Sequence, residues 1–196
     1  MATVVLIHGG LHEDMDAERF WVRPGIVAGL RDRGLDVLAP DRLPAAPTWA
    51  AEVDHLLPLL PSGPIVLVGG SNGCSVAVRL VLAQAHRVVG LVLAWPATAG
   101  DPVLDAALHE HLGSDELLTG ETLRGLSDAE LAGLRLPVAV VPSEPPNRVH
   151  QRHTVDALLR RLPSADEWPG SLEPPHPNFK PDGFVRELAR FTADQT

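Results

Sequence analysis

The chain has 196 residues, 45% of them hydrophobic and 21% charged, which suits one soluble globular domain with a substantial core. A formal net charge of −9 argues against nucleic acid and anionic membrane surfaces as partners. One cysteine excludes an intramolecular disulfide and a cysteine-rich metal site, and neither a signal peptide nor a membrane-spanning apolar run is recognisable. We expect a single cytoplasmic domain over residues 1–196.

Apolar strand-like runs alternate with helical patterns along the chain. The runs that are typical of buried strands are residues 3–7, 36–39, 65–68, 88–94, 138–141 and, more weakly, 165–168. The helical patterns between them are residues 24–33, 48–57, 72–86, 149–162 and 182–192. This alternation predicts βαβ units in a three-layer α/β/α sandwich with a mostly parallel sheet of about six strands.

Residues 98–136 have a different character from the rest of the chain. They contain eight carboxylates, scattered leucines and interior glycines. We interpret them as two or three short helices inserted as a small helical cap over the strand ends, which would shape a substrate pocket. The candidate pocket residues are His12, Trp95 and His109. The spacing of the histidines in this segment is not that of helical metal ligands, so no metal site is expected.

Gly69, Ser71 and Gly73 form a G-x-S-x-G pattern between the strand at 65–68 and the helix that follows. A serine on a sharp strand-to-helix turn has a strained backbone, and its neighbours two residues away must have almost no side chain. Such a turn raises the hydroxyl above the sheet at the positive end of a helix. The pattern therefore predicts Ser71 as a nucleophile, with an ordinary glycine-containing loop as the alternative.

A nucleophilic serine needs a base and a carboxylate that orients the base. In parallel α/β sheets, active sites lie outside the carboxyl ends of the strands. His176, in the loop before the last helix, is the predicted base. Glu144, after the strand at 138–141, is the predicted acid, and Asp101 is the alternative.

The other histidines and the cysteine have simpler interpretations. His150 and His153 fall on or beside a predicted helix, so we interpret them as surface residues, and His8 as a packing residue. Cys74 is expected to be a small buried residue rather than a second nucleophile.

Acyl transfer also needs backbone N–H groups directed at the developing oxyanion. Asn72 follows the nucleophile and would supply one donor. Gly10 or Leu11, in the glycine-containing loop after the first strand, would supply the other. The predicted chemistry needs no cofactor and no metal.

Together these segments resemble the α/β-hydrolase fold superfamily, in particular its compact serine hydrolase or esterase-like members. The resemblance rests on residues 4–10, 37–41 and 137–141, the turn at 69–73, the terminal helix and the order Ser71, acid, His176. It implies serine-dependent hydrolysis with a catalytic triad and an oxyanion hole. The chain starts at what resembles the third strand of the full fold, which leaves a sheet edge near residues 36–39 that a second copy could cover as a homodimer.

The leading hypothesis is a serine hydrolase that cleaves a small ester or thioester through an acyl-enzyme on Ser71. Two alternatives remain open: a non-hydrolytic lyase or cyclase on the same fold, and a non-catalytic binding protein with a decayed triad. The expected partner is a small-molecule substrate whose identity the residues do not specify.

Overall fold

A computed structural model of the chain describes residues 2–11, 14–112 and 115–195. Six strands form one sheet in the order β2-β1-β3-β4-β5-β6, and every neighbouring pair is parallel. Their bounds are β1 (Thr3–Ile7), β2 (Val37–Leu38), β3 (Ile65–Gly70), β4 (Val88–Ala94), β5 (Val138–Val141) and β6 (Ala165–Glu167). The predicted six-stranded α/β fold is confirmed.

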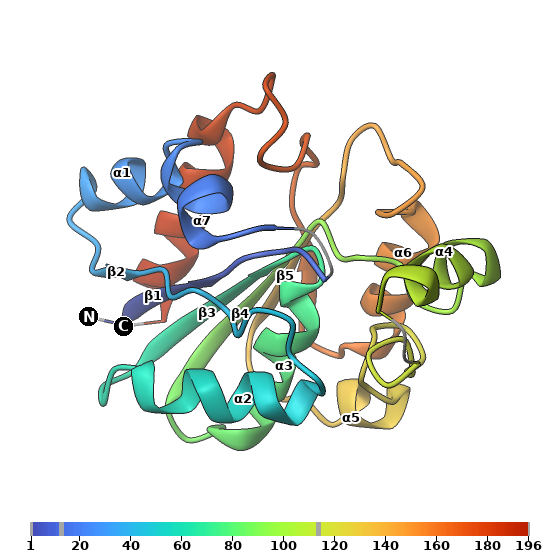
Figure 1. Cartoon of the computed structure of the whole chain (residues 1–196). Coiled ribbons are helices and arrows are strands. Elements are labelled where there is room, and N and C mark those ends of the chain that lie inside the picture. The colour runs from blue at the N-terminus through green and yellow to red at the C-terminus, as the bar shows by residue number, and fades with distance from the viewer. Residues whose placement is uncertain (1, 12–13, 113–114, 196) are drawn as a thin grey trace.

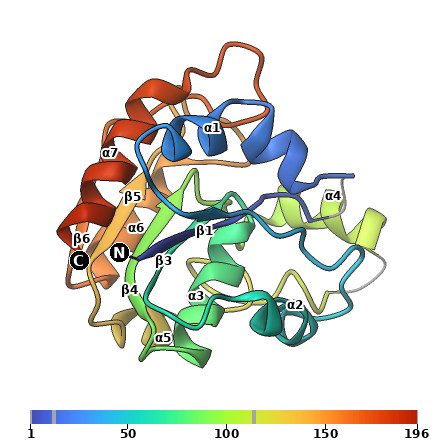
Figure 2. The same cartoon turned by 90° about the vertical axis from the view of Figure 1, so that its left-hand side faces the viewer.

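Helices cover both faces of this sheet (Figures 1 and 2). On one face lie the π-helical turn η1 (Glu18–Val22), α1 (Ile26–Arg31) and α7 (Pro181–Asp194). On the other lie α2 (Trp49–Leu56) with the 3₁₀ turn η2 (Leu57–Leu59), α3 (Gly73–Ala83), α5 (Asp128–Ala132) and α6 (Arg152–Arg161). One further helix, α4 (Pro102–Leu112), lies at the edge of the domain in Figure 1.

The two layers follow from the alternation of side chains along each strand. In β1, Val5 and Ile7 pack with α2 and α3, whereas Val4 and Leu6 pack with α1 and α7. Successive side chains of a strand point to opposite faces, so a strand buried on both faces must be apolar throughout. The uniformly apolar runs therefore determine the position of the sheet in the middle layer.

The segment 98–136 contains α4 and α5, and the described residues 115–127 between them form turns and irregular chain. Leu104, Leu108 and Leu118 form a small apolar cluster of their own, separate from the two main clusters. The side chain of Arg124, within this segment, is buried and pairs with Asp105 of α4, at 2.6 Å. The division of the chain into a main domain and a cap remains a prediction.

Helix boundaries differ from the expected ones at one place that matters for function. The helix expected to start at Val149 starts instead at Arg152, so the chain from Pro142 to Gln151 is a loop at the carboxyl end of β5. Thr48 caps α2 as expected, because its hydroxyl accepts the N–H of Ala51. Among the described residues, no helix is both long and apolar enough to cross a membrane.

Candidate active site

Ser71 lies on the sharp turn between β3 and α3 that its sequence context predicts. Its φ is +53°, a left-handed conformation that is strained for a residue with a side chain. A Cβ atom on Gly69 would lie 2.5 Å from the carbonyl oxygen of Gly73, and one on Gly73 would lie 2.4 Å from that of Ile7. Both glycines are therefore required by close backbone contacts, and they hold the Ser71 hydroxyl at the N-terminus of α3.

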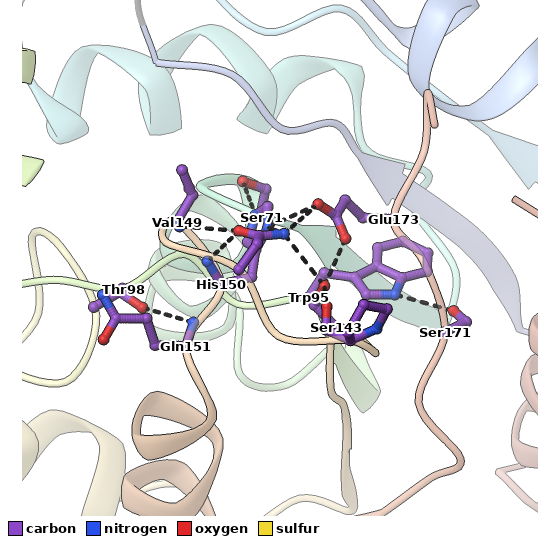
Figure 3. A network of polar contacts seen from close by, with 11 residues as sticks. Ser71, Trp95, Thr98, Ser143, Val149, His150, Gln151, Ser171 and Glu173 are labelled. Atoms are coloured by element: carbon purple, nitrogen blue, oxygen red, sulfur yellow. Dashed lines mark hydrogen bonds and ion pairs between the residues drawn. The ribbon is translucent and has the colours of Figure 1, made fainter. Parts of the chain in front are cut away.

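The residue that meets Ser71 is His150. Its Nε2 lies 2.9 Å from the Ser71 Oγ, and both side chains are almost completely buried. His150 belongs to the loop between β5 and α6, which reaches the carboxyl end of β3 from the far side of β4 (Figure 3). The interpretation of His150 as a surface helix residue is wrong, because the helix begins only after it.

A carboxylate completes this chain of hydrogen bonds. Glu173, in the loop after β6, has its Oε1 3.2 Å from the Nδ1 of His150. Ser143 donates to its other oxygen at 2.6 Å, and Asn147 donates to Oε1 at 2.7 Å. Burial alone would raise the pKa of Glu173, but the hydrogen bonds from His150 and Ser143 outweigh it and lower the pKa to about 2. Glu173 is thus an ionised acceptor, and a His150 tautomer that donates to it through Nδ1 has its Nε2 lone pair directed at Ser71.

The loop that carries His150 is shaped by its own asparagine. The Asn147 Oδ1 accepts the backbone N–H groups of Val149 and His150, at 2.9 and 3.0 Å. This is an asparagine-based turn, in which the side chain replaces a backbone acceptor. The next residue, Gln151, is fastened by its N–H to the Thr98 hydroxyl, at 3.0 Å. One side chain, Asn147, therefore both folds the loop and holds the carboxylate.

His176, the predicted base, lies elsewhere. It is exposed, and its Nδ1 accepts the backbone N–H of Asn178 at 3.1 Å, within its own turn. Its N–H in turn donates to the carbonyl of Glu173. This tight turn directs Glu173 toward the site and His176 toward solvent, so the expected pairing of His176 with Ser71 is corrected to a pairing with His150.

Neither predicted acid lies at the histidine. Glu144 is exposed, and its side chain lies against Gly170, on the other side of the chain from its neighbour Ser143. The reason is that consecutive residues of an extended segment point in opposite directions. Asp101 accepts the N–H groups of Val103 and Leu104 at the start of α4. It therefore caps a helix, and the carboxylate at the histidine is Glu173.

The loop after β1 lies directly against the nucleophile. A Cβ atom on Gly9 would lie 2.9 Å from the Cβ of Ser71, so only glycine lets the backbone approach this closely. Gly10 has a φ of +88°, another conformation that glycine adopts without strain. The predicted oxyanion donors Gly10 and Leu11 thus follow directly after the residue that touches Ser71, and Asn72 follows Ser71 at the start of α3.

A cavity of about 390 Å³ borders this loop, and the described residues that line it include His8, Gly9, Gly10 and Leu117. That volume is within the range of small-molecule sites. Ser71 itself is not one of the described residues that line it. Arg42 and Glu52 also line this cavity, so it lies on the side of the Gly9–Gly10 loop where these two residues are.

The predicted pocket residues have other surroundings. Trp95 is fully buried in an aromatic cluster with Trp21, Phe179 and Phe184, and its Nε1 donates to the Ser171 hydroxyl. His109 is half-exposed on α4 and pairs with Asp115 at 2.7 Å. His12 lies outside the described residues. Trp95 and His109 therefore do not line the cavity beside Gly10.

Cys74 is not placed to react, and the described residues form no metal site. Cys74 is completely buried, and burial raises the pKa of its thiol far above the ordinary value, which keeps it in the unreactive protonated form. No group of three or more His, Cys, Asp or Glu residues in the described ranges is arranged to hold a metal ion.

The chain is similar to known proteins in sequence and in structure. The family model of the alpha/beta hydrolase family matches residues 4–194, and the chain belongs to that family. No curated protein matches it by sequence.

Solved structures agree with the fold. A meta-cleavage product hydrolase from Pseudomonas fluorescens superimposes with a TM-score of 0.75 at 18% identity, covering 100% of this chain and 92% of that one. An esterase from a Rhodococcus species does so with a TM-score of 0.64 at 17% identity, covering 100% and 91%. At such identities the likeness establishes the fold and not the reaction.

The order of the polar residues along the chain differs from the one that the resemblance implied. In this fold the expected order is nucleophile, acid, histidine. Here the histidine lies after β5 and the carboxylate after β6, so the two have exchanged loops. A triad is defined by geometry and roles rather than by chain order, so the exchange preserves the same arrangement of functional groups.

Proposed function

We propose that the protein is a serine hydrolase that cleaves a small ester or thioester through an acyl-enzyme on Ser71. The observation that carries this proposal is the line of hydrogen bonds from Ser71 through His150 to Glu173. Its distances are 2.9 and 3.2 Å, within the range of nucleophile–base–acid arrangements. The strained Ser71 backbone and the family membership support the same reading.

The reaction follows from the roles of these three groups. The Ser71 Oγ attacks the acyl carbon while the His150 Nε2 takes its proton, and the carboxylate of Glu173 stabilises the imidazolium that forms. The tetrahedral intermediate collapses to the acyl-enzyme, and His150 returns the proton to the departing alcohol or thiol. Water then attacks the acyl-enzyme with His150 as base, which releases the carboxylic acid and regenerates Ser71.

The negative oxygen of the tetrahedral intermediate requires donors from the protein. We assign this role to the backbone N–H groups of Asn72 and of Gly10 or Leu11. Asn72 is at the positive end of α3, where a developing anion is favoured. The low exposure of Ser71, 8%, favours a small acyl substrate over a polymeric one.

The test compares a matched pair of histidine variants, together with a Ser71 variant, on a short-chain nitrophenyl ester. His150→Ala should lower kcat by about 10³-fold or more, because the base is lost, whereas His176→Ala should leave it within about twofold. Ser71→Ala should remove activity and also labelling by a fluorophosphonate probe. If His176→Ala instead causes the large loss, the proposed base is wrong.

The same probe separates hydrolysis from the other two functions. A wild-type protein that transforms a substrate without any covalent adduct on Ser71 would be a lyase or cyclase. A wild-type protein that neither labels nor turns over any ester would be a binding protein, and either result would overturn the proposal. Labelling of Ser71 that disappears in His150→Ala and persists in His176→Ala would support it.

A further inference from the structure

A buried ion pair stands behind the loop that follows β1. The guanidinium of Arg42 bonds Oε1 of Glu52 through Nε at 3.1 Å and through Nη2 at 2.5 Å, and both side chains are almost completely buried. Arg42 follows β2, and Glu52 lies in the first turns of α2. A buried pair of this kind adds little net stability over apolar packing, so its presence beside a functional loop calls for another explanation.

The third nitrogen of Arg42 is used entirely on the backbone of that loop. Its Nη1 lies 3.2, 3.3 and 2.7 Å from the carbonyl oxygens of His8, Gly9 and Gly10. The backbone N–H of Arg42 donates to the His8 Nε2 at 3.0 Å, and the His8 Nδ1 lies 2.8 Å from the Gly9 carbonyl. Burial lowers the pKa of His8, so the ring is neutral and can donate through Nδ1 while it accepts through Nε2.

These contacts bear on the N–H groups to which the oxyanion role is assigned. The Gly9 carbonyl belongs to the same planar peptide unit as the Gly10 N–H, and the Gly10 carbonyl to the same unit as the Leu11 N–H. In a trans peptide the C=O and N–H bonds point in opposite directions across a rigid plane. Hydrogen bonds that hold these carbonyls toward Arg42 therefore determine the direction of both N–H groups.

The loop needs such support because it has no stiffness of its own. Gly9 and Gly10 lack side chains, and glycine is the residue with the greatest backbone freedom. Gly9 cannot be replaced, because its Cα lies too close to Ser71 and Phe20 for any Cβ. Electrostatic stabilisation of an oxyanion depends on donors that are already oriented before the reaction. The guanidinium of Arg42, shared among the carbonyls of residues 8–10, supplies that orientation.

We propose that Arg42, held by Glu52, is a positioning residue that orients the peptide units carrying the Gly10 and Leu11 N–H groups, so that one of them can act as the oxyanion donor. The inference rests on the proposed acyl transfer at Ser71. It assigns to Arg42 a function in the rate of the chemical step and not in substrate binding, because the guanidinium acts through the peptide groups. Loss of Arg42 should therefore reduce kcat and leave KM nearly unchanged.

The experiment uses Arg42→Lys, which keeps the charge opposite Glu52 but cannot bridge the carboxylate and the carbonyls at once. We expect kcat on the nitrophenyl ester and the rate of fluorophosphonate labelling to fall together by about 10- to 100-fold, with KM within about threefold of the wild-type value. Amide hydrogen exchange in residues 9–11 should become faster, while exchange in β5 stays unchanged.

Arg87→Gln is the matched control. Arg87 also donates to a backbone carbonyl, that of Pro61, but at the amino end of the sheet, before β4. It should lower stability without altering kcat, labelling or exchange in residues 9–11. If Arg42→Lys fails to fold, Arg42→Gln measured near its own stability maximum replaces it with the same expectations.

The outcomes separate this inference from the proposed function. A wild-type protein without Ser71 labelling or hydrolysis refutes the acyl-transfer proposal, whatever the variants do. An active wild type combined with an Arg42→Lys variant that retains kcat and labelling within about twofold overturns the role of Arg42 alone. Unchanged exchange in residues 9–11 of that variant overturns it as well, independently of any activity.

Discussion

The turn that carries Ser71 and the two loops that carry its partners lie at the same edge of the sheet, yet they are specified in different ways. The turn between β3 and α3 depends on sterics, because Ser71 has a positive φ and neither flanking glycine has room for a Cβ. A Cβ on Gly69 would meet the backbone of Gly73, and one on Gly73 would meet the carbonyl of Ile7 at the end of β1. The loops after β5 and β6 depend on contacts between residues 23 to 30 positions apart, from His150 and Ser143 to Glu173. A position with no room for a Cβ requires glycine, which can be recognised in the sequence. A hydrogen bond between two loops requires no such residue type and leaves no recognisable pattern.

The largest loss of stability and activity is expected where a side chain is placed in the space that the turn at Ser71 lacks. Gly73→Ala would place a methyl group 2.4 Å from the Ile7 carbonyl oxygen and 2.5 Å from that of His8. The backbone must shift to relieve this overlap, so the free energy of unfolding should fall by about 3 kcal/mol or more, and activity should be lost with it. Denaturant unfolding and ester hydrolysis measure both effects.

Gly183→Ala is the control for this change. Gly183 lies in α7, is exposed, and a Cβ there would meet no atom within 4 Å. Since alanine is the better helix former, the variant should gain about 0.5–1 kcal/mol and keep full activity. A Gly73→Ala protein as stable as Gly183→Ala would show that the turn is not limited by these contacts.

The next largest effect concerns the contact between Glu173 and His150. Glu173→Gln should lower kcat by about 10³- to 10⁴-fold, because the amide no longer fixes the His150 tautomer or stabilises its charged form. Glu144→Gln should change kcat by less than about twofold, since Glu144 is exposed and turned away. Steady-state kinetics on one ester compares the pair, and equal losses in both would contradict the assignment of Glu173.

The ionisation of Glu173 gives a smaller effect on stability. Its pKa in the folded protein is about 2, below the ordinary value of 4.5. The unfolded chain therefore takes up the proton first as pH falls, so the stabilisation by this carboxylate is complete above about pH 4.5 and is lost as pH falls toward 2. Unfolding measured across this range should show a weaker pH dependence in Glu173→Gln than in the wild type. Parallel curves for the two proteins would contradict the hydrogen bonds to Glu173.

The smallest effect is expected at Asn147. Asn147→Ala should lower kcat by about 10-fold and stability by about 1 kcal/mol, because it removes one donor to Glu173 and the turn that holds His150. Asn178→Ala, at an exposed site after His176, is the matched control and should be neutral in both measurements. A reduced kcat in Asn178→Ala would instead point to the turn at residues 173–176.

The errors in the predicted site have a common physical origin. The sequence pattern predicts a helix from Val149, but the Asn147 side chain accepts the N–H groups of Val149 and His150 and keeps both residues out of the helix. An asparagine after two prolines was the one available signal for a loop there. Glu173 offered no comparable signal, because nothing near it distinguishes it from Glu144.

The fold, the sharp turn at Ser71 and the glycine-containing loop after β1 are predicted from the sequence alone, since strands buried on both faces must be apolar throughout and positions without room for a Cβ must be glycine. Only the tertiary structure decided that His150 and Glu173 meet Ser71, and that Arg42 and Glu52 stand behind Gly10. The reason is that parallel strands bring loops from distant parts of the chain to one edge. Which side chain of each loop turns inward then depends on hydrogen bonds between loops, and those bonds form only when the sheet is assembled.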